Sequence, residues 1–469
     1  MPGHPASGTP VVCVQGLGFV GGAMAIAIAS ARDPEGRPRF TAIGVDLPTP
    51  LGQERIDALN AGRFPFVTGD HTLVAAAAAA HAAGNLRATS DPAVFAEADI
   101  VVVDIHLDVA RSGDASSIDF TGFRAAIRTI ASHARPGTLV IVETTVPPGT
   151  CERVVAPELA AALRARGLRE DALLLAHSYE RVMPGEDYLA SITNFWRVYS
   201  GHTPAAADAC EAFLSQVINV ADYPLTRLAS TTASETAKVL ENSYRATNIA
   251  FIEEWGRFAE AVGIDLFEVL TAIRRRPTHN NIRQPGFGVG GYCLTKDPLF
   301  VGIAARELFD RPDLGFPFSE MAVRVNAVMP LVSLDRVQTL LGGTLRGKRI
   351  LLMGVAYRQD VADTRYSPSQ TFVEEARRRG ADVVAHDPLV TEWPELGIAV
   401  AAEPPPAHSV DAVVLAVPHR AYRAFDFSAW LQGATPIVLD ANAVLTAAQR
   451  QAVIASGAAL HAIGEGRRA

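Results

Sequence analysis

A glycine-rich loop near the N-terminus constrains the fold of this chain more than any other feature. It reads Gly16-Leu17-Gly18-Phe19-Val20-Gly21, follows a β-branched run at residues 11–14 and opens a small-residue stretch at 23–31. In a strand, tight loop and helix of this kind, the first glycine makes the turn and the second lets backbone N–H groups approach a ligand. The third allows the helix to pack closely on the strand. The order predicts a helix N-terminus that binds a pyrophosphate.

A carboxylate at the end of the next predicted strand adds to this interpretation. Residues 40–45 indicate a second buried strand, which ends at Asp46. Asp46 would accept hydrogen bonds from adenosine ribose hydroxyls and repel a 2′-phosphate, so NAD is favoured over NADP. An ordinary glycine turn beside a surface aspartate is the alternative. The gap between Gly16 and Asp46 exceeds the usual spacing of about 20 residues, and the polar stretch 32–39 accounts for the excess.

Short apolar runs alternate with helix-like segments in two separate parts of the chain, and long helical periodicity lies between them. Strands are predicted at 100–103 and 138–142, and again at 349–353, 382–385, 412–416 and 436–439. We therefore predict an α/β fold in which a helical central domain joins two Rossmann-like, doubly wound parallel-sheet domains. The predicted domains are residues 1–203, 204–330 and 331–469.

Charge and hydropathy exclude several classes of partner. The 469 residues include 50 acidic and 42 basic side chains, a net charge of −8, so no overall field attracts nucleic acid or an anionic membrane. The uncharged stretch 11–31 is long enough to span a membrane, but its glycines and the lack of a preceding basic residue argue against a span or a signal peptide. We expect neither nucleic acid nor membrane as a partner, and no metal site.

The four cysteines, Cys13, Cys151, Cys210 and Cys293, are too few for a disulfide framework, which favours a reducing compartment such as the cytoplasm. Cys293 lies in Gly286-Phe287-Gly288-Val289-Gly290-Gly291-Tyr292-Cys293-Leu294-Thr295-Lys296-Asp297. A neighbouring cation such as Lys296 would favour a nucleophilic thiolate. A buried structural cysteine is the alternative, and it suits Cys13 within its strand.

Four polar residues, Glu235, Lys238, Asn242 and Arg245, are spaced three, four and three apart in the helical middle and so share one helix face. A solvated charged stripe is the common explanation for such a pattern, and Glu235 can pair with Lys238. Asn242 and Arg245 continue the polar line beyond that pair. Spacing alone leaves a catalytic or substrate-binding face open as the second interpretation.

Taken together, these motifs resemble the UDP-glucose/GDP-mannose dehydrogenase family, the four-electron oxidases of nucleotide sugars. Six segments carry the resemblance in order along nearly the whole chain: 16–21, Glu143-Thr144-Thr145-Val146-Pro147-Pro148-Gly149-Thr150, Tyr179-Glu180-Arg181-Val182-Met183-Pro184-Gly185, 235–248, the Cys293 loop and 357–368. The resemblance implies an N-terminal NAD domain, a helical dimerisation core, a C-terminal domain that holds the nucleotide, and a homodimer.

The resemblance also implies the chemistry of individual residues. Cys293 matches the nucleophile that captures the aldehyde as a thiohemiacetal and carries the thioester, and Asp297 matches the carboxylate beside it. Lys238 and Asn242 match the residues that stabilise oxyanions, while Thr145 and Glu180 match the pair that positions water and transfers protons. The implied cofactor contacts are Gly16, Leu17, Gly18, Phe19, Val20, Gly21, Asp46, Thr145 and Arg365. The implied substrate contacts are Glu180, Arg181, Lys238, Asn242, Arg245, Gly288 and Arg358.

The sequence departs from the family pattern at two places. Val103-Asp104-Ile105-His106 replaces a Val-Pro-Thr-Pro-like turn, and Pro277-Thr278-His279 replaces a His-Pro-Arg-like segment. Substrate signals are mixed: Thr295-Lys296 follows the glucose type, whereas 180–185 and 241–245 resemble members that oxidise UDP-N-acetylhexosamines. We expect a UDP-N-acetylhexosamine 6-dehydrogenase, with UDP-glucose as the alternative sugar.

Two other functions remain as alternatives. A two-electron β-hydroxyacid dehydrogenase would share the dinucleotide loop and the helical middle, yet it would have no use for Cys293 or a second α/β domain. A catalytically silent nucleotide-sugar-binding protein is supported only by the altered turn at Asp104.

Overall fold

The computed structural model describes residues 8–112 and 115–466, which form two compact units. The first unit comprises the described residues up to Leu240 together with Phe300–Gly315. The second comprises Glu241–Leu299 and the described residues from Phe316 onward. One long helix, α8 (Thr231–Val262), begins in the first unit and ends in the second.

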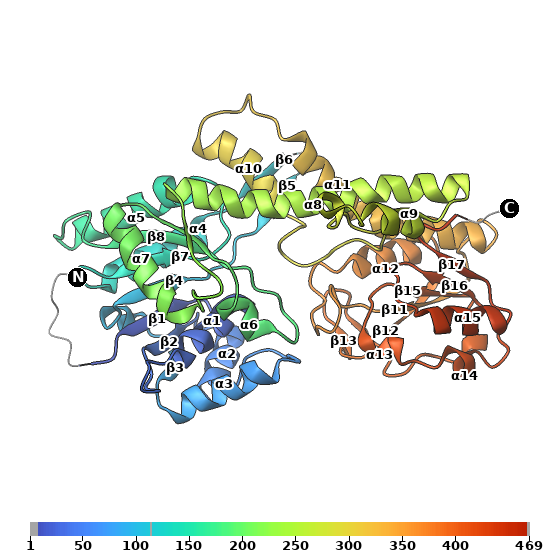
Figure 1. The fold of residues 1–469 in the computed structure, drawn as a ribbon, viewed down its shortest axis with the longest axis horizontal. Coiled ribbons are helices and arrows are strands. Elements are labelled where there is room, and N and C mark those ends of the chain that lie inside the picture. The colour runs from blue at the N-terminus through green and yellow to red at the C-terminus, as the bar shows by residue number, and fades with distance from the viewer. Residues whose placement is uncertain (1–7, 113–114, 467–469) are drawn as a thin grey trace. The chain divides into compact units, whose positions relative to one another are not determined.

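An eight-stranded sheet forms the centre of the first unit, in the order β10-β9-β8-β7-β4-β1-β2-β3 (Figure 1). Its strands are β1 (Val11–Gln15), β2 (Thr41–Val45), β3 (Leu86–Thr89), β4 (Ile100–Val103), β7 (Leu139–Val142), β8 (Leu174–Tyr179), β9 (Val198–Gly201) and β10 (Thr226–Arg227). Neighbouring strands are parallel except for β8 and β9, which are antiparallel. Strand order reverses between β1 and β4, and such a switch point opens a ligand crevice at the carboxyl ends of the strands.

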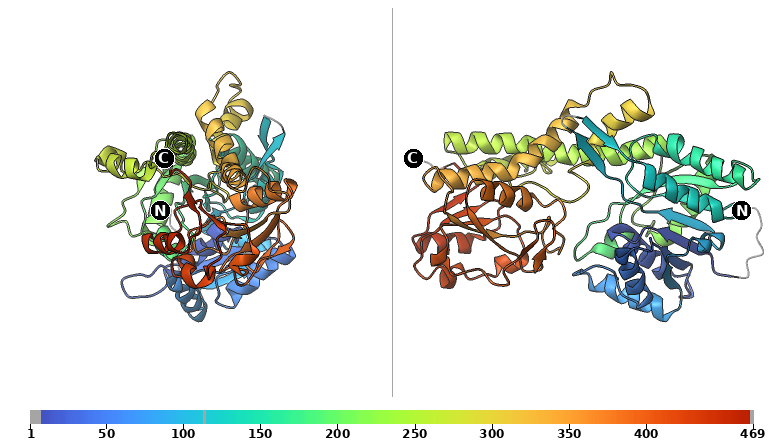
Figure 2. Two further views of the ribbon diagram at one scale, coloured as in Figure 1. Left: turned by 90° about the vertical axis from the view of Figure 1, so that its right-hand side faces the viewer. Right: turned by 180° about the vertical axis from the view of Figure 1, so that it is seen from behind.

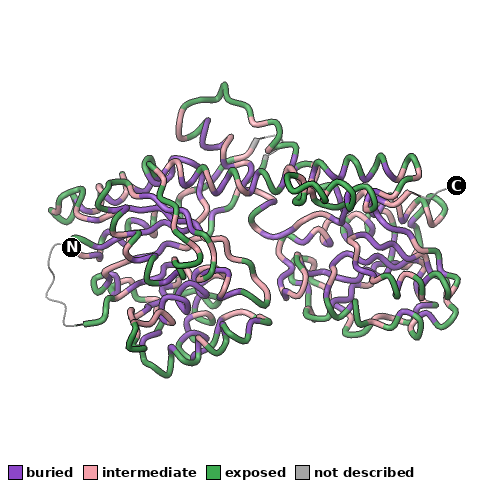
Figure 3. Tube along the Cα trace, viewed as in Figure 1, coloured by how far each residue is buried: buried purple, intermediate pink, exposed green. Residues whose placement is uncertain are grey.

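Helices pack on this sheet because they are rich in small and apolar residues. The described α-helices of the first unit, α8 aside, are α1 (Phe19–Ser30), α2 (Pro50–Asn60), α3 (His71–Ala82), α4 (Thr121–His133), α5 (Ala156–Ala165), α6 (Tyr188–Thr193), α7 (Pro204–Val217) and α10 (Phe300–Ile303). The buried side chains of α1 and α7 join those of the strands in one apolar core. Buried positions follow the strands of each sheet (Figure 3).

The segment Phe300–Gly315 belongs to the first unit through specific contacts. Arg306 Nη2 donates to Ser116 O at 2.6 Å, beside the hairpin of β5 (Val109–Ser112) and β6 (Ala115–Ile118). The Phe309 ring lies so close to Gly149 that a Cβ at that glycine would stand 2.6 Å from it. The segment thereby packs against the turn that follows β7.

The second unit contains a five-stranded parallel sheet in the order β12-β11-β15-β16-β17 (Figure 1). Figure 2 shows the ribbon from two further sides. Its strands are β11 (Arg349–Met353), β12 (Asp382–His386), β15 (Ala412–Leu415), β16 (Ile437–Asp440) and β17 (Leu460–Ala462), with a separate pair β13 (Glu392–Trp393) and β14 (Ile398–Ala399). The α-helices are α9 (Leu266–Ile273), α11 (Pro317–Leu340), α12 (Pro368–Arg378), α13 (Arg420–Arg423), α14 (Phe427–Leu431) and α15 (Ala447–Ala455). A second doubly wound α/β fold therefore follows the helical middle.

The structure confirms the predicted fold class and most strand positions. The runs predicted at 100–103 and 349–353 coincide with β4 and β11. The reversed strand β9 was not predicted; it pairs antiparallel with β8. The division into residues 1–203, 204–330 and 331–469 stays a prediction. Among the described residues, no helix has the length and apolar character of a membrane span.

Candidate active site

The glycine loop after β1 has the geometry of a dinucleotide site. Gly16 has φ +97°, and a Cβ there would lie 2.5 Å from Asp104 O. A Cβ at Gly21 would lie 1.9 Å from Gly16 O, whereas one at Gly18 would meet nothing within 4 Å. The first and third glycines are therefore required by the fold, and the open space lies at the second. Because no side chain caps α1, its N-terminal N–H groups fit the diphosphate of NAD.

Asp46 lies directly after β2 and braces the same loop. Its Oδ2 accepts the Leu17 N–H at 3.1 Å and its Oδ1 accepts the Leu47 N–H at 2.8 Å. Arg55 Nη1 lies 3.3 Å from Oδ2. A carboxylate oxygen accepts more than one hydrogen bond, so this contact pattern fits a further bond from a ribose hydroxyl.

At the altered turn after β4, the partly buried Asp104 lies beside the buried Glu143. Asp104 lies within hydrogen-bonding reach of Glu143, and burial, followed by the charge and hydrogen bond of Glu143, raises the pKa of Asp104 well above its usual range. Asp104 Oδ2 and Glu143 Oε2 meet no hydrogen-bond partner among the described residues. Arg197, itself buried, pairs with Glu143. Burial and the neighbouring Glu143 thus favour the protonated form of Asp104.

Glu180 and Lys238 meet within the first unit. Glu180 directly follows β8, and Lys238 is on α8. Lys238 Nζ donates to Glu180 O at 2.7 Å and lies 3.5 Å from Glu180 Oε1. Both side chains are largely buried, so the ammonium and carboxylate attract each other more strongly than a surface pair would. The structure thus brings together two residues that we predict to be catalytic.

The predicted Glu235–Lys238 pair was wrong. Glu235 accepts backbone N–H groups from Gly149 at 2.5 Å and from Cys151 at 2.7 Å, in the turn that follows β7. Its burial raises its pKa to about 7. Helical spacing put the two side chains on one face, but these N–H groups need an acceptor, and Glu235 supplies it.

Thr145 and Arg181 occupy neighbouring strand ends in the same unit. Thr145 is partly buried in the turn between β7 and η2 (Cys151–Val155). Arg181 Nη1 donates to Trp196 O at 2.6 Å, and its guanidinium carbon lies 5.4 Å from the centroid of the Tyr179 ring. Strands β7 and β8 are parallel neighbours, so their carboxyl ends place Thr145 and Glu180 at one edge of the sheet.

Cys293 is exposed in the second unit, while Cys13, Cys151 and Cys210 are buried. Burial raises the pKa of Cys13 to about 12, which agrees with a structural cysteine. Near Cys293, the buried Asp297 accepts from Asn242 Nδ2 at 2.8 Å and from Lys296 Nζ at 2.8 Å. Asn242 and Asp297, both predicted site residues, therefore form one hydrogen-bonded group beside the thiol-bearing loop.

The glycines before Cys293 are required by the chain itself. A Cβ at Gly290 would lie 2.4 Å from Tyr366 O, and one at Gly291 would lie 2.8 Å from Tyr357 Cε2. Gly291 also has φ +77°. Larger residues at these positions would push the loop away from the tyrosines, so the glycines set the position of Cys293 in the second unit.

Arg365 lies beside the same loop. It forms a two-point ion pair with Asp363 at 2.8 and 2.9 Å, and its guanidinium carbon lies 4.8 Å from the centroid of the Tyr292 ring. Hydrogen bonding and charge from Asp363, which outweigh burial, raise the pKa of Arg365. Arg245 is exposed on α8.

A cavity of about 270 Å³ lies at the carboxyl end of the second sheet. Gly288 and Arg358, both predicted substrate contacts, line it together with Tyr357, Gln359, Pro418 and Asn442. Arg358 is exposed there, so its guanidinium is accessible to an anionic ligand.

Comparison with known proteins assigns this arrangement to a family. Residues 11–217 match the NAD binding domain of the UDP-glucose/GDP-mannose dehydrogenase family, residues 232–327 match its central domain, and residues 351–447 match its UDP binding domain. The chain belongs to the UDP-glucose/GDP-mannose dehydrogenase family. It is therefore an enzyme, an NAD-dependent nucleotide-sugar dehydrogenase, and the predicted NAD cofactor and nucleotide-sugar substrate class are confirmed.

Relatives in this dehydrogenase family match over almost the full chain. The UDP-N-acetyl-D-mannosamine dehydrogenase of Methanocaldococcus jannaschii is 26% identical over 98% of this chain and 97% of its own. An NDP-N-acetyl-D-galactosaminuronic acid dehydrogenase of Ralstonia nicotianae is 29% identical over 88% and 92%. The solved NDP-N-acetyl-D-galactosaminuronic acid dehydrogenase of Methanosarcina mazei superimposes with a TM-score of 0.79 at 27% identity, over 98% of this chain and 96% of that one.

Several residues at these dehydrogenase sites escaped the sequence analysis. Glu143 and Arg197 form a buried pair, and their separation of 54 positions hides it in the sequence. Asp387 follows a strand, as Asp46 does, and that position is the signal that could have found it. His419, which contacts Asp387, carries no comparable signal in the sequence.

Proposed function

We propose that this enzyme oxidises the C6 hydroxymethyl group of a UDP-N-acetylhexosamine to the uronic acid by a four-electron route through Cys293. The observation that carries the proposal is the exposure of Cys293 in a glycine loop whose neighbours Asn242, Lys296 and Asp297 are already hydrogen-bonded. A two-electron alcohol oxidation would need no thiol. A catalytically silent nucleotide-sugar-binding protein would need no hydrogen-bonded polar group beside a thiol.

Cys293 acts after the first oxidation has converted the alcohol to an aldehyde. Its thiolate sulfur forms a bond to C6, and the carbonyl oxygen takes up a proton to give a thiohemiacetal. The second oxidation removes hydride from C6 and the hydroxyl proton, which leaves a thioester. Water then adds to the thioester carbon, the C–S bond breaks, and the carboxylate leaves with the thiolate restored. NAD, when bound, accepts the hydride in each oxidation.

Asn242 and Asp297 act beside the thiol. The Asn242 amide donates to developing negative charge on the C6 oxygen, and its bond to Asp297 fixes the amide orientation. Lys296, paired with Asp297, keeps a cation next to the loop. Gly288 and Arg245 contribute to sugar binding in this proposal.

Glu180 and Lys238 act on the cofactor side. The Lys238 ammonium, held by Glu180 O, stabilises negative charge on the oxygen bonded to C6, and the Glu180 carboxylate accepts a proton. Thr145 positions water, and Arg181 contributes a substrate contact. In this proposal Arg365 contacts the cofactor, Arg358 contacts the nucleotide diphosphate, and residues 16–21 with Asp46 hold NAD.

The sugar assignment rests on the relatives named above, which act on N-acetylated hexosamines by their names, and on the 180–185 and 241–245 segments. UDP-glucose is the second candidate because Thr295-Lys296 resembles the family members that oxidise UDP-glucose. A solved UDP-glucose dehydrogenase from Pyrobaculum islandicum is also 25% identical, with a TM-score of 0.78.

We further propose a homodimer of three-domain chains in the cytoplasm. On α8, the exposed side chains Phe251, Trp255, Phe258 and Val262 recur at helical spacing and form an apolar face, which supports a partner helix there. The four cysteines, none of them in a disulfide, support a reducing compartment. Analytical ultracentrifugation tests the dimer, because a monomer at micromolar concentration contradicts it.

A panel of nucleotide sugars tests the substrate. UDP-N-acetylmannosamine, UDP-N-acetylglucosamine, UDP-N-acetylgalactosamine, UDP-glucose and GDP-mannose are each incubated with NAD, and products are identified by mass. We expect the highest kcat/KM with a UDP-N-acetylhexosamine and a uronic acid as product. A preference for UDP-glucose would select the second candidate, and no turnover with any sugar would refute both.

The covalent role is tested with Cys293→Ser and Cys293→Ala. Neither variant can form a thioester, so uronic acid production should fall by about 1000-fold or more, within the range of a lost nucleophile. Binding of UDP and of NAD, measured by calorimetry, should remain within about twofold and serves as the control. Steady-state uronic acid formation at the wild-type rate would exclude the covalent route.

A further inference from the structure

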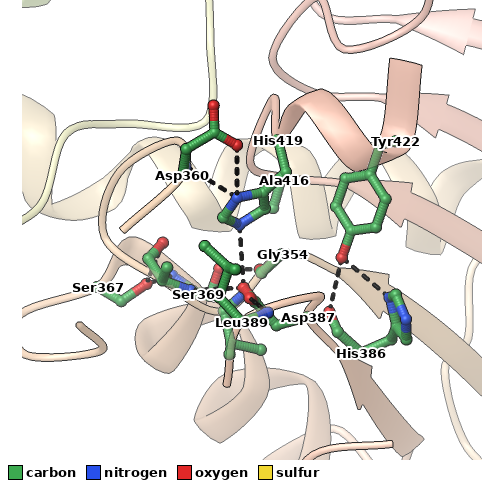
Figure 4. Close-up of polar contacts among 12 residues, drawn as sticks. Gly354, Asp360, Ser367, Ser369, His386, Asp387, Leu389, Ala416, His419 and Tyr422 are labelled. Atoms are coloured by element: carbon green, nitrogen blue, oxygen red, sulfur yellow. Dashed lines mark hydrogen bonds and ion pairs between the residues drawn. The ribbon is translucent and has the colours of Figure 1, made fainter. Parts of the chain in front are cut away.

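His419 is buried between two loops at the carboxyl edge of the second sheet. It follows β15, and Figure 4 shows its ring between Asp360 and Asp387. Its Nε2 lies 3.1 Å from Asp387 Oδ2, and its Nδ1 lies 3.0 Å from the Asp360 backbone N. Nδ1 also lies 3.6 Å from Asp360 Oδ1, which is too long for a hydrogen bond. Because the ring is inaccessible to water, the two hydrogen bonds indicate which nitrogen carries the proton.

Asp387 settles the role of Nε2. Its Oδ2 also accepts the N–H groups of Val355 at 2.8 Å and Ala356 at 3.1 Å, and its Oδ1 accepts that of Leu389 at 3.0 Å. The carboxylate is therefore an acceptor only, and Nε2 must donate to it.

Asp360 settles the role of Nδ1. A backbone N–H can only donate, so Nδ1 must present its lone pair to the Asp360 N–H. The two hydrogen bonds therefore favour the tautomer of His419 with its proton on Nε2. The same Asp360 accepts the Arg420 N–H at 3.0 Å and Arg420 Nε at 2.9 Å, which ties the loop after β11 to the loop after β15.

The loop held in this way carries cavity-lining residues. Asp360 has φ +56°, a conformation that non-glycine residues rarely adopt without support from their surroundings. Arg358 and Gln359 directly precede it and line the cavity, and Pro418 lines it from the loop that carries His419. The Nδ1 contact therefore fixes the backbone two residues from the guanidinium to which we assign the diphosphate.

We propose that His419 is a positioning residue for nucleotide binding: its Nδ1 lone pair holds the Asp360 N–H and so orients Arg358 toward the nucleotide diphosphate. The proposal rests on the assignment of Arg358 in the proposed function. His419 touches neither the sugar nor the reacting carbon in this account. Its loss should weaken nucleotide binding and leave the chemical steps unchanged.

Two substitutions separate the two ring nitrogens. In His419→Asn the amide oxygen reaches the Nδ1 position and can accept the Asp360 N–H, while the bond to Asp387 is lost. In His419→Gln the amide nitrogen reaches the Nε2 position and can donate to Asp387, while the Nδ1 acceptor is lost. Free UDP is the probe, and its Kd is measured by calorimetry on the full-length enzyme.

We expect His419→Gln to raise the Kd of UDP about tenfold, the effect of one lost hydrogen bond, and to raise the KM of the nucleotide sugar with kcat unchanged. His419→Asn should stay within about threefold of wild type. The matched control is His386→Gln, a buried histidine of the same sheet that contacts Tyr422 and does not line the cavity (Figure 4). It should leave UDP binding unchanged.

Three results would overturn the positioning role: equal Kd values for the Asn and Gln variants, wild-type UDP binding in the Gln variant, or a fall in kcat alone. Arg358→Ala separates failure of the His419 role from failure of the proposed function. If this variant binds UDP as tightly as wild type, the assignment of Arg358 to the diphosphate is itself wrong. If the variants do not fold, ¹⁵N NMR of the His419 imidazole in the wild-type enzyme shows which ring nitrogen carries the proton. A proton on Nδ1 would contradict the proposal, and a proton on Nε2 alone supports it.

Discussion

The two large sheets share one arrangement at their first strand: a glycine follows that strand, and a carboxylate follows its neighbour. In the first sheet, β1 is followed by Gly16 with φ +97°, and Asp46, after the adjacent β2, accepts a loop N–H. In the second, β11 is followed by Gly354 with φ +103°, and Asp387, after the adjacent β12, accepts two loop N–H groups. The strand-end carboxylate therefore holds the first loop of both sheets.

The helix that follows each loop differs. α1 begins at Phe19, directly after the glycine loop, and has no side-chain cap. α12 begins at Pro368, after a long loop, and Ser367 accepts the Ser369 N–H at 3.2 Å as its cap. The N-terminal N–H groups of α1 are thus available to a diphosphate, while one N–H group of α12 is already bound by the helix's own cap. In the second sheet, the proposed function instead assigns the recognition of the diphosphate to the cation Arg358 on the long loop.

The largest effect is expected at the open helix end. In Gly18→Glu the side chain has room, because a Cβ there meets nothing within 4 Å. Its carboxylate would lie where the NAD diphosphate binds, and charge repulsion of about 3 kcal/mol should raise the Kd of NAD on the order of a hundredfold. Binding of UDP should not change, because that site belongs to the second sheet. Calorimetry with each ligand measures both.

Gly18→Ala is the matched control, since it fills the same space without charge. It should change NAD affinity by less than about threefold. Equal NAD binding by the Glu variant and wild type would show that the cofactor does not use this helix end, and the contrast between the two sheets would fail.

A smaller effect, visible only across pH, is expected at the end of β4. There the first sheet has Asp104 and the matching strand of the second, β15, is followed by Ala416. The raised pKa means that the fold favours the protonated acid. This contribution to the free energy of unfolding is complete below the ordinary pKa of an aspartate and is lost as pH rises through the raised pKa.

Asp104→Asn tests this dependence, because the amide can donate to Glu143 without a titrating proton. Between pH 5 and 9, the free energy of unfolding of wild type should fall relative to the variant by up to about 1.4 kcal/mol per pH unit. Urea unfolding at each pH gives the slopes. Parallel curves for the two proteins would mean that Asp104 does not hold a proton in the fold.

The smallest effect is expected at the capped helix of the second sheet. Ser367→Ala removes the cap of α12 and should lower the free energy of unfolding by about 1 kcal/mol. The Kd of NAD should be unchanged, and Ser367→Thr, which keeps the hydroxyl, serves as the control. A loss of stability in both variants alike would point to packing rather than capping.

Local patterns in the sequence predicted the elements well. β4 and β11 have the predicted bounds because each is a short run of apolar residues followed by polar or glycine positions. The glycine loop and the Cys293 loop were found because their residue types are unusual. The exposure of Cys293 agrees with a functional thiol, while the roles of the individual site residues stay predictions.

Long-range partners could not be predicted in the same way. Helical spacing placed Glu235 and Lys238 on one face, yet Glu235 satisfies N–H groups 84 and 86 positions away, and Lys238 reaches Glu180. The protonated form of Asp104 and the tautomer of His419 depend on burial and on partners from other strands. No local pattern encodes either of them.

The central claim is that one active site performs two successive oxidations through Cys293, and the ratio of NADH formed to uronic acid formed tests it most directly. With the preferred UDP-N-acetylhexosamine in excess, NADH is followed by absorbance and the uronic acid by mass in the same reaction. The account predicts two NADH for each uronic acid, with no aldehyde released. One NADH for each molecule of sugar consumed, with an aldehyde as the product, would contradict it.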